Sequence, residues 1–208
     1  MSLPMMVLCA VLSYLLGSLN FGIIITKLFT GTDLRNYGSG NAGTTNAYRV
    51  LGLGPTVWVM LGDALKGVIA LLLCGLIAGE AGSYYAFLFV VLGHVFPLFH
   101  DFRGGKGILT AEAMVMVLDW RIGVILLGIF LVVVFSTRYV SLGSCLAVST
   151  YPVWVAIFHP ENDIMLFTGL FAATWIVILH RENVKRLFKG TENKFTPRKS
   201  VKRQEKAE

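Results

Sequence analysis

The stretch IGVILLGIFLVVVFS, residues 122–136, holds no charged side chain and decides the class of fold. A run of this kind is typical of a helix that crosses a lipid bilayer. Several other apolar runs, some of them short of the roughly 20 residues that cross the hydrocarbon core, lie at residues 4–29, 55–79, 84–99, 107–118, 141–158 and 164–180. Short spans are tolerated where helices are broken or surround a polar cavity. The pattern predicts an all-α polytopic integral membrane protein with about seven transmembrane helices, with five or six as the alternative.

The composition agrees with a membrane protein. Hydrophobic residues make up 55% of the 208 residues and charged residues only 14%, which excludes an ordinary soluble domain. The first apolar run lacks a basic leading segment and a small-residue cleavage site, so it is expected to be a retained helix. Cys9, Cys74 and Cys145 all lie within apolar runs without a C-x-x-C pair. They are expected to be small buried side chains, with neither a disulfide framework nor a metal site.

Charged residues are distributed unevenly between the connecting segments. With seven spans, one side of the membrane receives, besides the C-terminal segment, the basic residues Lys27, Arg35, Arg49, Arg103, Lys106 and Arg138. The other side receives Arg121 as its basic residue, together with the acidic residues Glu80, Asp119, Glu161 and Asp163. Because Lys and Arg are enriched in cytoplasmic loops, this asymmetry predicts the N-terminus outside and the C-terminus in the cytoplasm. It also favours an odd number of spans.

The chain is expected to divide into a single transmembrane helical domain at 1–183 and a basic cytoplasmic tail at 184–208. From Arg181 to Glu208 there are ten Lys or Arg and four Glu, and this net charge equals the +6 of the whole chain. We expect the tail to be attracted to anionic lipid headgroups. Nucleic-acid binding is disfavoured because the tail is short and its basic residues are not interleaved with aromatic ones.

Three polar stretches fall on the predicted cytoplasmic side. They are GSGNAGTTNAYR at 38–49, FRGGKG at 102–107 and HREN at 180–183. Because these sequence-distant stretches reach the same membrane face, we expect them to form one shared site.

The first stretch contains G-x-G-x-x-G as Gly38, Gly40 and Gly43. A dinucleotide-binding turn would need a preceding strand in a soluble βαβ unit, whereas the flanks here are membrane helices, so that interpretation is disfavoured. Glycines let backbone N–H groups approach an anion closely, and a loop so rich in donors favours an anion site over a merely flexible loop. The residues expected to bind phosphate here, besides Gly40 and Gly43, are Asn41, Thr45 and Asn46, and Ser39 and Arg49 add further donors to the loop.

The second stretch places Lys106 among Gly104, Gly105 and Gly107. It is not a Walker A loop, because the upstream glycine is missing and Gly107 stands where Ser or Thr should follow the lysine. A glycine-rich turn that opens a helix still offers unpaired N–H groups and the positive end of the helix dipole. We expect phosphate to bind here, with an ordinary basic loop that follows the positive-inside rule as the alternative.

In the third stretch His180 and Asn183 are three residues apart and share a helical face, away from Glu182. A histidine at a membrane interface is often only a polar cap. Beside two loops that favour anions, a functional role is the stronger interpretation.

Two further features interrupt the apolar runs. Asp63 and Lys66 each cost roughly 2.5–3.5 kcal/mol within a span. Their spacing allows a mutual ion pair, and the alternative is that one of them lines a polar cavity. For His94 a packing and hydrogen-bonding role is favoured over chemistry. Pro97 is expected to kink or end its helix.

Several kinds of chemistry are disfavoured by what the sequence lacks. It has no paired carboxylates, no H-E-x-x-H and no Cys/His cluster, so we expect no metal and no cofactor. It also lacks the H-x-x-x-x-D of acyl-CoA-dependent acyltransferases and the D-G-x-x-A-R of phosphatidyl-alcohol transferases. A site rich in phosphate donors and poor in strong bases suits an anionic, already activated substrate such as an acyl phosphate. The alternatives are a transporter, with its anion site near the bilayer midplane, and a structural scaffold, which would not need three donor-rich loops.

The stretches GSGNAGTTNAYRVLG, GDALKG, GHVFPLFHDFRGGKG and HREN also resemble, in order and spacing, those of the bacterial acyl-phosphate:glycerol-3-phosphate acyltransferases (PlsY type). The resemblance runs from Tyr14 to Asn183. It implies a multi-span enzyme of the bacterial cytoplasmic membrane whose active site faces the cytoplasm. It implies transfer of a fatty acyl group from acyl phosphate to sn-glycerol 3-phosphate, which yields lysophosphatidate and phosphate without acyl-CoA or acyl carrier protein.

By motif position, the resemblance implies catalytic roles for Ser39, Arg49, Lys106, His180 and Asn183. It implies a structural role for Glu182. The proton acceptor is either a substrate phosphate oxygen or His180. The chain departs from the family pattern at Leu109 and Glu112, where a small residue and no acid are expected, and altered local packing should follow.

Overall fold

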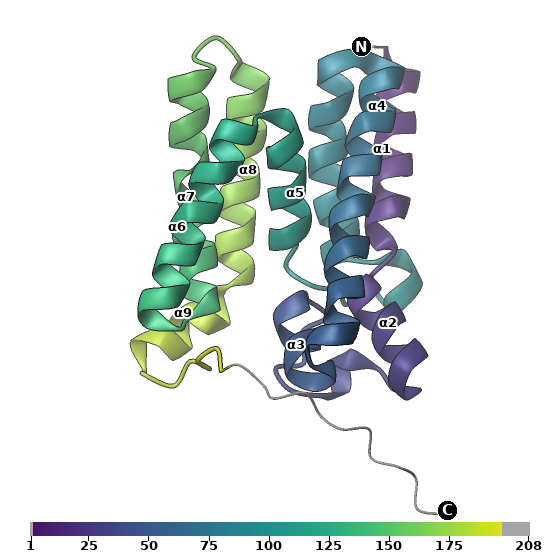
Figure 1. Ribbon diagram of the computed structural model, residues 1–208. Helices are drawn as coiled ribbons and strands as arrows, with labels where there is room; N and C mark the ends of the chain where they lie inside the picture. The colour runs from purple at the N-terminus through teal and green to yellow at the C-terminus, as the bar shows by residue number, and fades with distance from the viewer. Residues whose placement is uncertain (1, 197–208) are drawn as a thin grey trace, which may run out of the picture.

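The computed structural model describes residues 2–196 and contains helices but no strand within that range (Figure 1). In chain order the α-helices are α1 (Leu3–Ser18), α2 (Phe21–Thr30), α3 (Thr44–Leu51), α4 (Leu53–Val95), α5 (Ile108–Leu118), α6 (Trp120–Thr137), α7 (Val140–Phe158), α8 (Asp163–Leu179) and α9 (Arg181–Phe188). Short 3₁₀ turns lie at Leu34–Asn36 and Leu98–His100. The predicted all-α class is confirmed.

Helix α4 is a hairpin of two helical arms. Its 43 residues are interrupted by non-helical backbone at Ala78 and at Gly79, whose φ of 66° is left-handed. The arms pack closely after this break, because a Cβ added at Gly82 would lie 2.1 Å from the carbonyl oxygen of Cys74. The two arms correspond to the predicted runs 55–79 and 84–99. The second arm ends at Val95, just before Pro97, as predicted.

Four stretches of the described chain are long and apolar enough to cross a membrane, and α8 together with α9, which bends from it by 56°, makes a fifth. These stretches are Leu3–Thr30, Leu53–His100, Trp120–Thr137 and Val140–Phe158. Helix α5 is apolar but shorter. Because α4 has two arms, the apolar helical segments agree with the predicted runs to within a few residues, while the number of crossings stays a prediction.

Close helix packing depends on glycine. A Cβ added at Gly17 of α1 would lie 2.3 Å from the carbonyl oxygen of Val90, and one added at Gly93 would lie 2.3 Å from that of Tyr14. Helix α1 and the second arm of α4 therefore meet backbone to backbone, as is common between helices in membranes.

The first predicted run, 4–29, is divided into α1 and α2. The break falls at Leu19 and Asn20, where the Asn20 side chain caps α2 by accepting a hydrogen bond from Ile23 N at 3.2 Å. The freed carbonyl of Leu19 accepts a hydrogen bond from Lys66 Nζ at 2.9 Å. These two polar contacts explain a break that the apolar pattern does not indicate.

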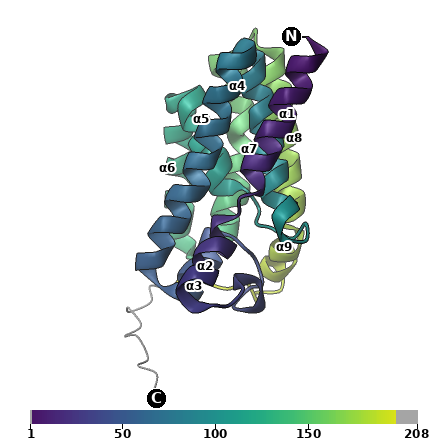
Figure 2. The same ribbon diagram turned by 90° about the vertical axis from the view of Figure 1, so that its right-hand side faces the viewer.

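The polar segments gather at one end of the helix bundle. Helices α2, α3 and α9 lie at this end in both views, whereas α1 begins at the opposite end (Figures 1 and 2). The three polar stretches consequently approach one another, as predicted.

Candidate active site

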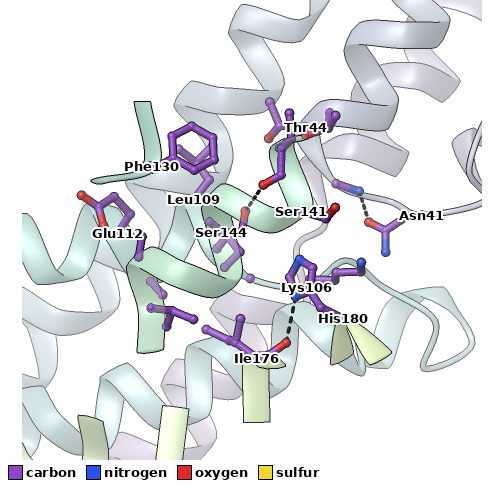
Figure 3. Close-up of a pocket in the computed structure, with 18 of the residues that line it drawn as sticks. Asn41, Thr44, Lys106, Leu109, Glu112, Phe130, Ser141, Ser144, Ile176 and His180 are labelled. Carbon is purple, nitrogen blue, oxygen red and sulfur yellow. Dashed lines mark hydrogen bonds between the residues drawn. The ribbon is translucent and has the colours of Figure 1, made fainter. Parts of the chain in front are cut away.

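A cavity of about 440 Å³ opens between the helices at this end. The polar end of the cavity is lined by Ser39, Asn41, Thr44, Thr45, Arg49, Lys106, His180, Asn183, Arg186 and Glu192. The apolar part of the cavity is lined by residues that include Phe87, Leu109, Leu126, Phe130, Val148 and Ile176. Figure 3 shows Lys106 and His180 on one side of the cavity and Leu109 and Phe130 on the other. Residues from all three polar stretches line this cavity, so the prediction that the three stretches come together is confirmed.

Asn46 shapes the first loop from within. Its Oδ1 accepts a hydrogen bond from Ser39 N at 2.8 Å, while its Nδ2 donates to the carbonyls of Tyr37 and Asn41 at 2.9 Å each. The side chain is buried, and both ends of its amide bond the loop. Asn46 therefore positions the loop. It also lines the cavity with Ser39 and Asn41, so its expected contact with phosphate stays a prediction.

Two helix N-termini line the polar end of the cavity. Helix α3 begins after Gly43 and α5 begins after Gly107, and neither has a side-chain cap. Gly43, Thr44, Gly107 and Ile108 all line the cavity. The first N–H groups of a helix lack partners within it and carry a partial positive charge, so each terminus favours a bound anion.

Gly104 and Gly105 fix the second loop to the end of α4. Their amides donate to the carbonyls of Val95 and His94 at 3.0 and 3.1 Å. A Cβ added at Gly104 would lie 1.9 Å from His94 O, and one at Gly105 would lie 2.2 Å from His94 Nε2. These amides are used within the protein, so the predicted phosphate contact of the two glycines is replaced by a packing role. Lys106 and Gly107, which line the cavity, are better placed for an anion.

Lys106 brings a buried positive charge to the polar end. Its ammonium donates a hydrogen bond to Asn183 Oδ1. Burial lowers the pKa of Lys106 to about 8. His180, also buried, donates from Nδ1 to the carbonyl of Ile176 at 2.8 Å, because a carbonyl only accepts. In its neutral form His180 therefore keeps Nε2 as an acceptor.

Glu192 is a residue of the site that the sequence analysis misses. Its carboxylate accepts hydrogen bonds from Asn183 Nδ2 at 2.7 Å, Ser141 Oγ at 2.8 Å and Arg186 Nε at 2.7 Å. Burial works against its charge, but bonds from these three partners hold the pKa of Glu192 below its ordinary value. Its only sequence signal is that it is an acid within a basic segment.

The segment that contains Glu192 was predicted to be the start of a tail at 184–208. Residues 184–196 instead contribute Arg186, Glu192 and Asn193 to the cavity. The remainder of the predicted tail, residues 197–208, lies outside the described residues, so its attraction to anionic lipid stays a prediction.

Asp63, Lys66 and His94 form a buried cluster beside the cavity. Lys66 Nζ lies 2.7 Å from Asp63 Oδ1 and 2.8 Å from His94 Nδ1. The predicted ion pair and the predicted hydrogen-bonding role of His94 are confirmed. Asp63 and His94 also line the cavity, so both interpretations of the Asp63 and Lys66 pair hold. Glu182, in contrast, lies on the surface and pairs with Lys185 at 2.9 Å.

The departures from the family pattern lie in or near the apolar part of the cavity. Leu109 and Glu112 both line it, and Glu112 Oε1 is buried with no hydrogen-bond partner in residues 2–196. Within the same range no three His, Cys, Asp or Glu residues come together as a metal site.

Fold and cavity together define an all-helical integral membrane protein whose cavity has a polar end, rich in hydrogen-bond donors, joined to an apolar part. The chain belongs to the glycerol-3-phosphate acyltransferase family, whose model matches residues 7–190. It is 43% identical over 196 residues to the glycerol-3-phosphate acyltransferase of Thermoanaerobacter sp. (strain X514), covering 94% of this chain and 98% of that protein. The corresponding protein of Carboxydothermus hydrogenoformans is 39% identical, with 94% of this chain and 100% of that protein covered.

Two solved structures of a glycerol 3-phosphate acyltransferase are also similar to this chain. The crystal structure of PlsY (YgiH), an integral membrane glycerol 3-phosphate acyltransferase, in its glycerol 3-phosphate form matches with a TM-score of 0.85 and 36% identity. The match covers 92% of this chain and 96% of that one. The lysophosphatidic acid form of that protein matches with a TM-score of 0.83 and 33% identity, over the same shares of the two chains.

Proposed function

We propose that this protein transfers a fatty acyl group from acyl phosphate to the 1-hydroxyl of sn-glycerol 3-phosphate, which forms lysophosphatidate and phosphate. The observation that carries the proposal is the cavity, in which an end lined by Lys106, Arg49 and two uncapped helix N-termini continues into an apolar part. The reaction joins an anionic head to an acyl chain, so it needs both environments in one place. The glycerol 3-phosphate and lysophosphatidic acid forms of PlsY support the acceptor and the product.

Two anions must lie close together in this reaction, and the polar end has the charges for both. Lys106 and the start of α5 form one group of donors, and Arg49, Ser39 and the start of α3 form the other. Both groups act on charge that builds up as the carbonyl is attacked, and fixed donors in a site of low dielectric act strongly there. The acyl chain lies among the helices that line the apolar part.

The acceptor hydroxyl oxygen attacks the acyl carbon, and the bond from that carbon to the phosphate oxygen breaks. Phosphate is a good leaving group, so little acid catalysis is needed. The hydroxyl proton passes to a phosphate oxygen or to His180 Nε2. A His180→Ala variant with residual activity separates the two routes: an unchanged shape of the pH–rate profile excludes His180 as the base, and loss of the acidic limb supports it.

We propose seven crossings of the bacterial cytoplasmic membrane, with the N-terminus outside and the site facing the cytoplasm. The division of α4 into two arms supports this count. The basic residues Arg35, Arg103 and Arg186 occur in or beside the segments that gather around α3 and α9. Because basic loops face the cytoplasm, this end of the bundle is assigned to that side.

Phosphate release by the purified protein tests the proposed reaction. With palmitoyl phosphate as donor, release should depend on added glycerol 3-phosphate, and lysophosphatidate should form in equal amount. Folded protein that binds glycerol 3-phosphate but releases no phosphate would overturn the proposal and favour transport of a phosphorylated solute.

A further inference from the structure

The segment after α9 crosses the polar end of the cavity. We call residues 189–196 the C-terminal strap. Phe195 N donates to the carbonyl of Arg138, at the end of α6, at 2.7 Å. The ring of Phe195 stacks on Tyr48 of α3, with 5.3 Å between centroids. The strap is thus attached to both sides of the cavity, and Glu192 and Asn193 face inward from it.

Glu192 is the part of the strap that reaches the substrate-binding residues. Its side chain is only 5% exposed, and its two oxygens accept the three hydrogen bonds from Asn183, Ser141 and Arg186. A buried carboxylate with this many donors is held in one position, because losing any of them would leave a buried charge poorly satisfied.

The contact with Glu192 determines which way the Asn183 amide points. A carboxylate only accepts hydrogen bonds, so Asn183 must turn its Nδ2 toward Glu192. An ammonium only donates, so Asn183 must turn its Oδ1 toward Lys106. Reversing the amide would break both contacts at once. The Asn183 amide therefore has only one orientation that satisfies both Glu192 and Lys106.

We propose that Glu192 is a positioning residue for acyl transfer, one that orients Asn183 and through it holds the Lys106 ammonium at the anion-binding end. The proposal rests on the proposed function. It gives the C-terminal strap a role in binding glycerol 3-phosphate, although this segment follows the polar stretches that carry the family resemblance.

The charge of Glu192 adds a second effect. It lies near enough to Lys106 to favour the protonated ammonium, against the burial that lowers the pKa of this lysine. A proton-acceptor role is not open to Glu192, because its oxygens already accept bonds from three partners and Arg186 pairs with its charge at 2.7 Å.

The test compares Glu192→Gln with the wild-type protein under identical conditions. The glutamine keeps the size of the side chain but loses the charge. Its NH₂ only donates, so its single oxygen can no longer accept from both Asn183 and Arg186. The KM for glycerol 3-phosphate should rise about tenfold, with a smaller change in the KM for palmitoyl phosphate. The alkaline limb of kcat/KM should move to lower pH, because Lys106 loses its proton more easily. Glu192→Asp, which keeps the charge, should restore the alkaline limb toward its wild-type position.

Glu182→Gln is the matched control, because Glu182 is on the same helix as Asn183 but exposed at its surface, and its kinetics should stay unchanged. Wild-type KM and pH profile in active Glu192→Gln would overturn the proposal. Equal loss of activity and of melting temperature in Glu192→Gln and Glu192→Asp would also overturn it and assign Glu192 to folding. Absence of acyl transfer in the wild-type protein would instead contradict the proposed function.

Discussion

Lys106 donates a hydrogen bond to Asn183 across the polar end of the cavity, although the two residues are 77 positions apart in the sequence. The contact joins the loop before α5 to helix α9. It places a buried ammonium between an uncapped helix N-terminus and a row of hydrogen-bonded polar side chains. The position of the Lys106 ammonium therefore depends on two parts of the chain that are far apart in the sequence, the loop before α5 and helix α9.

Replacement of Lys106 by alanine should remove most acyl transfer. The variant loses the buried charge that faces the phosphate, and removing one such donor typically lowers kcat by about 10²–10³. Phosphate release that depends on glycerol 3-phosphate is the measurement. Lys185→Ala is the control, because Lys185 is exposed and pairs only with Glu182 among the salt bridges of the described chain. Equal activity of the two variants would contradict the role of Lys106.

The pH dependence should reflect Lys106. Its pKa in the folded protein is lowered to about 8 by burial, so the ammonium is charged below that pH and becomes neutral above it. Phosphate binding needs the charged form, so kcat/KM for glycerol 3-phosphate should fall as the pH rises through about 8. Kinetics across this range, with melting temperature followed in parallel, give the test. A profile flat to well above this pH would contradict it.

Much of the fold was predictable because the signals are local. Runs without charge predicted the helical segments, and Pro97 predicted the end of α4. The positions of loops rich in Gly, Asn and Lys predicted the shared polar site. These patterns act over a few residues and need no knowledge of tertiary packing.

Other features depend on contacts between distant residues. The glycines at 104 and 105 look like a phosphate loop, but their role is decided by the carbonyl and ring of His94. Glu192 lies in a basic segment. Its role follows from its hydrogen bonds with Asn183 and Ser141, which are 9 and 51 positions away in the sequence. No pattern in the sequence around Glu192 indicates these partners.

Breaking the buried cluster around Lys66 should strongly lower the stability of the folded protein. Lys66→Met leaves Asp63 buried without its closest positive partner, a loss that typically costs about 3–5 kcal/mol. We expect a clear fall in the melting temperature of the protein in detergent. Replacing Asp63 and Lys66 together by leucine should recover part of it, because no unpaired charge is then buried.

The surface provides a control with the same spacing. Lys185 and Glu182 are also three positions apart and paired, but both are exposed. Lys185→Met should leave the melting temperature unchanged, since water solvates the partner that remains. An equal effect of the two lysine substitutions would show that burial does not decide the difference.

Substitution of Gly104 tests whether the second loop is positioned by close packing on α4. An alanine Cβ at Gly104 would lie 1.9 Å from the carbonyl oxygen of His94 and 2.8 Å from Pro97 Cδ, and a backbone oxygen cannot rotate away. Gly104→Ala should cost about 1–3 kcal/mol by overpacking and should displace Lys106, with a loss of acyl transfer beyond the loss of stability. Gly54→Ala is the control. Gly54 lies in the first turn of α4, and a Cβ added there would meet no neighbouring atom within 4 Å. It should be neutral or slightly stabilising. Wild-type activity and melting temperature in Gly104→Ala would contradict this prediction. They would show that close packing against His94 and Val95 does not position the loop.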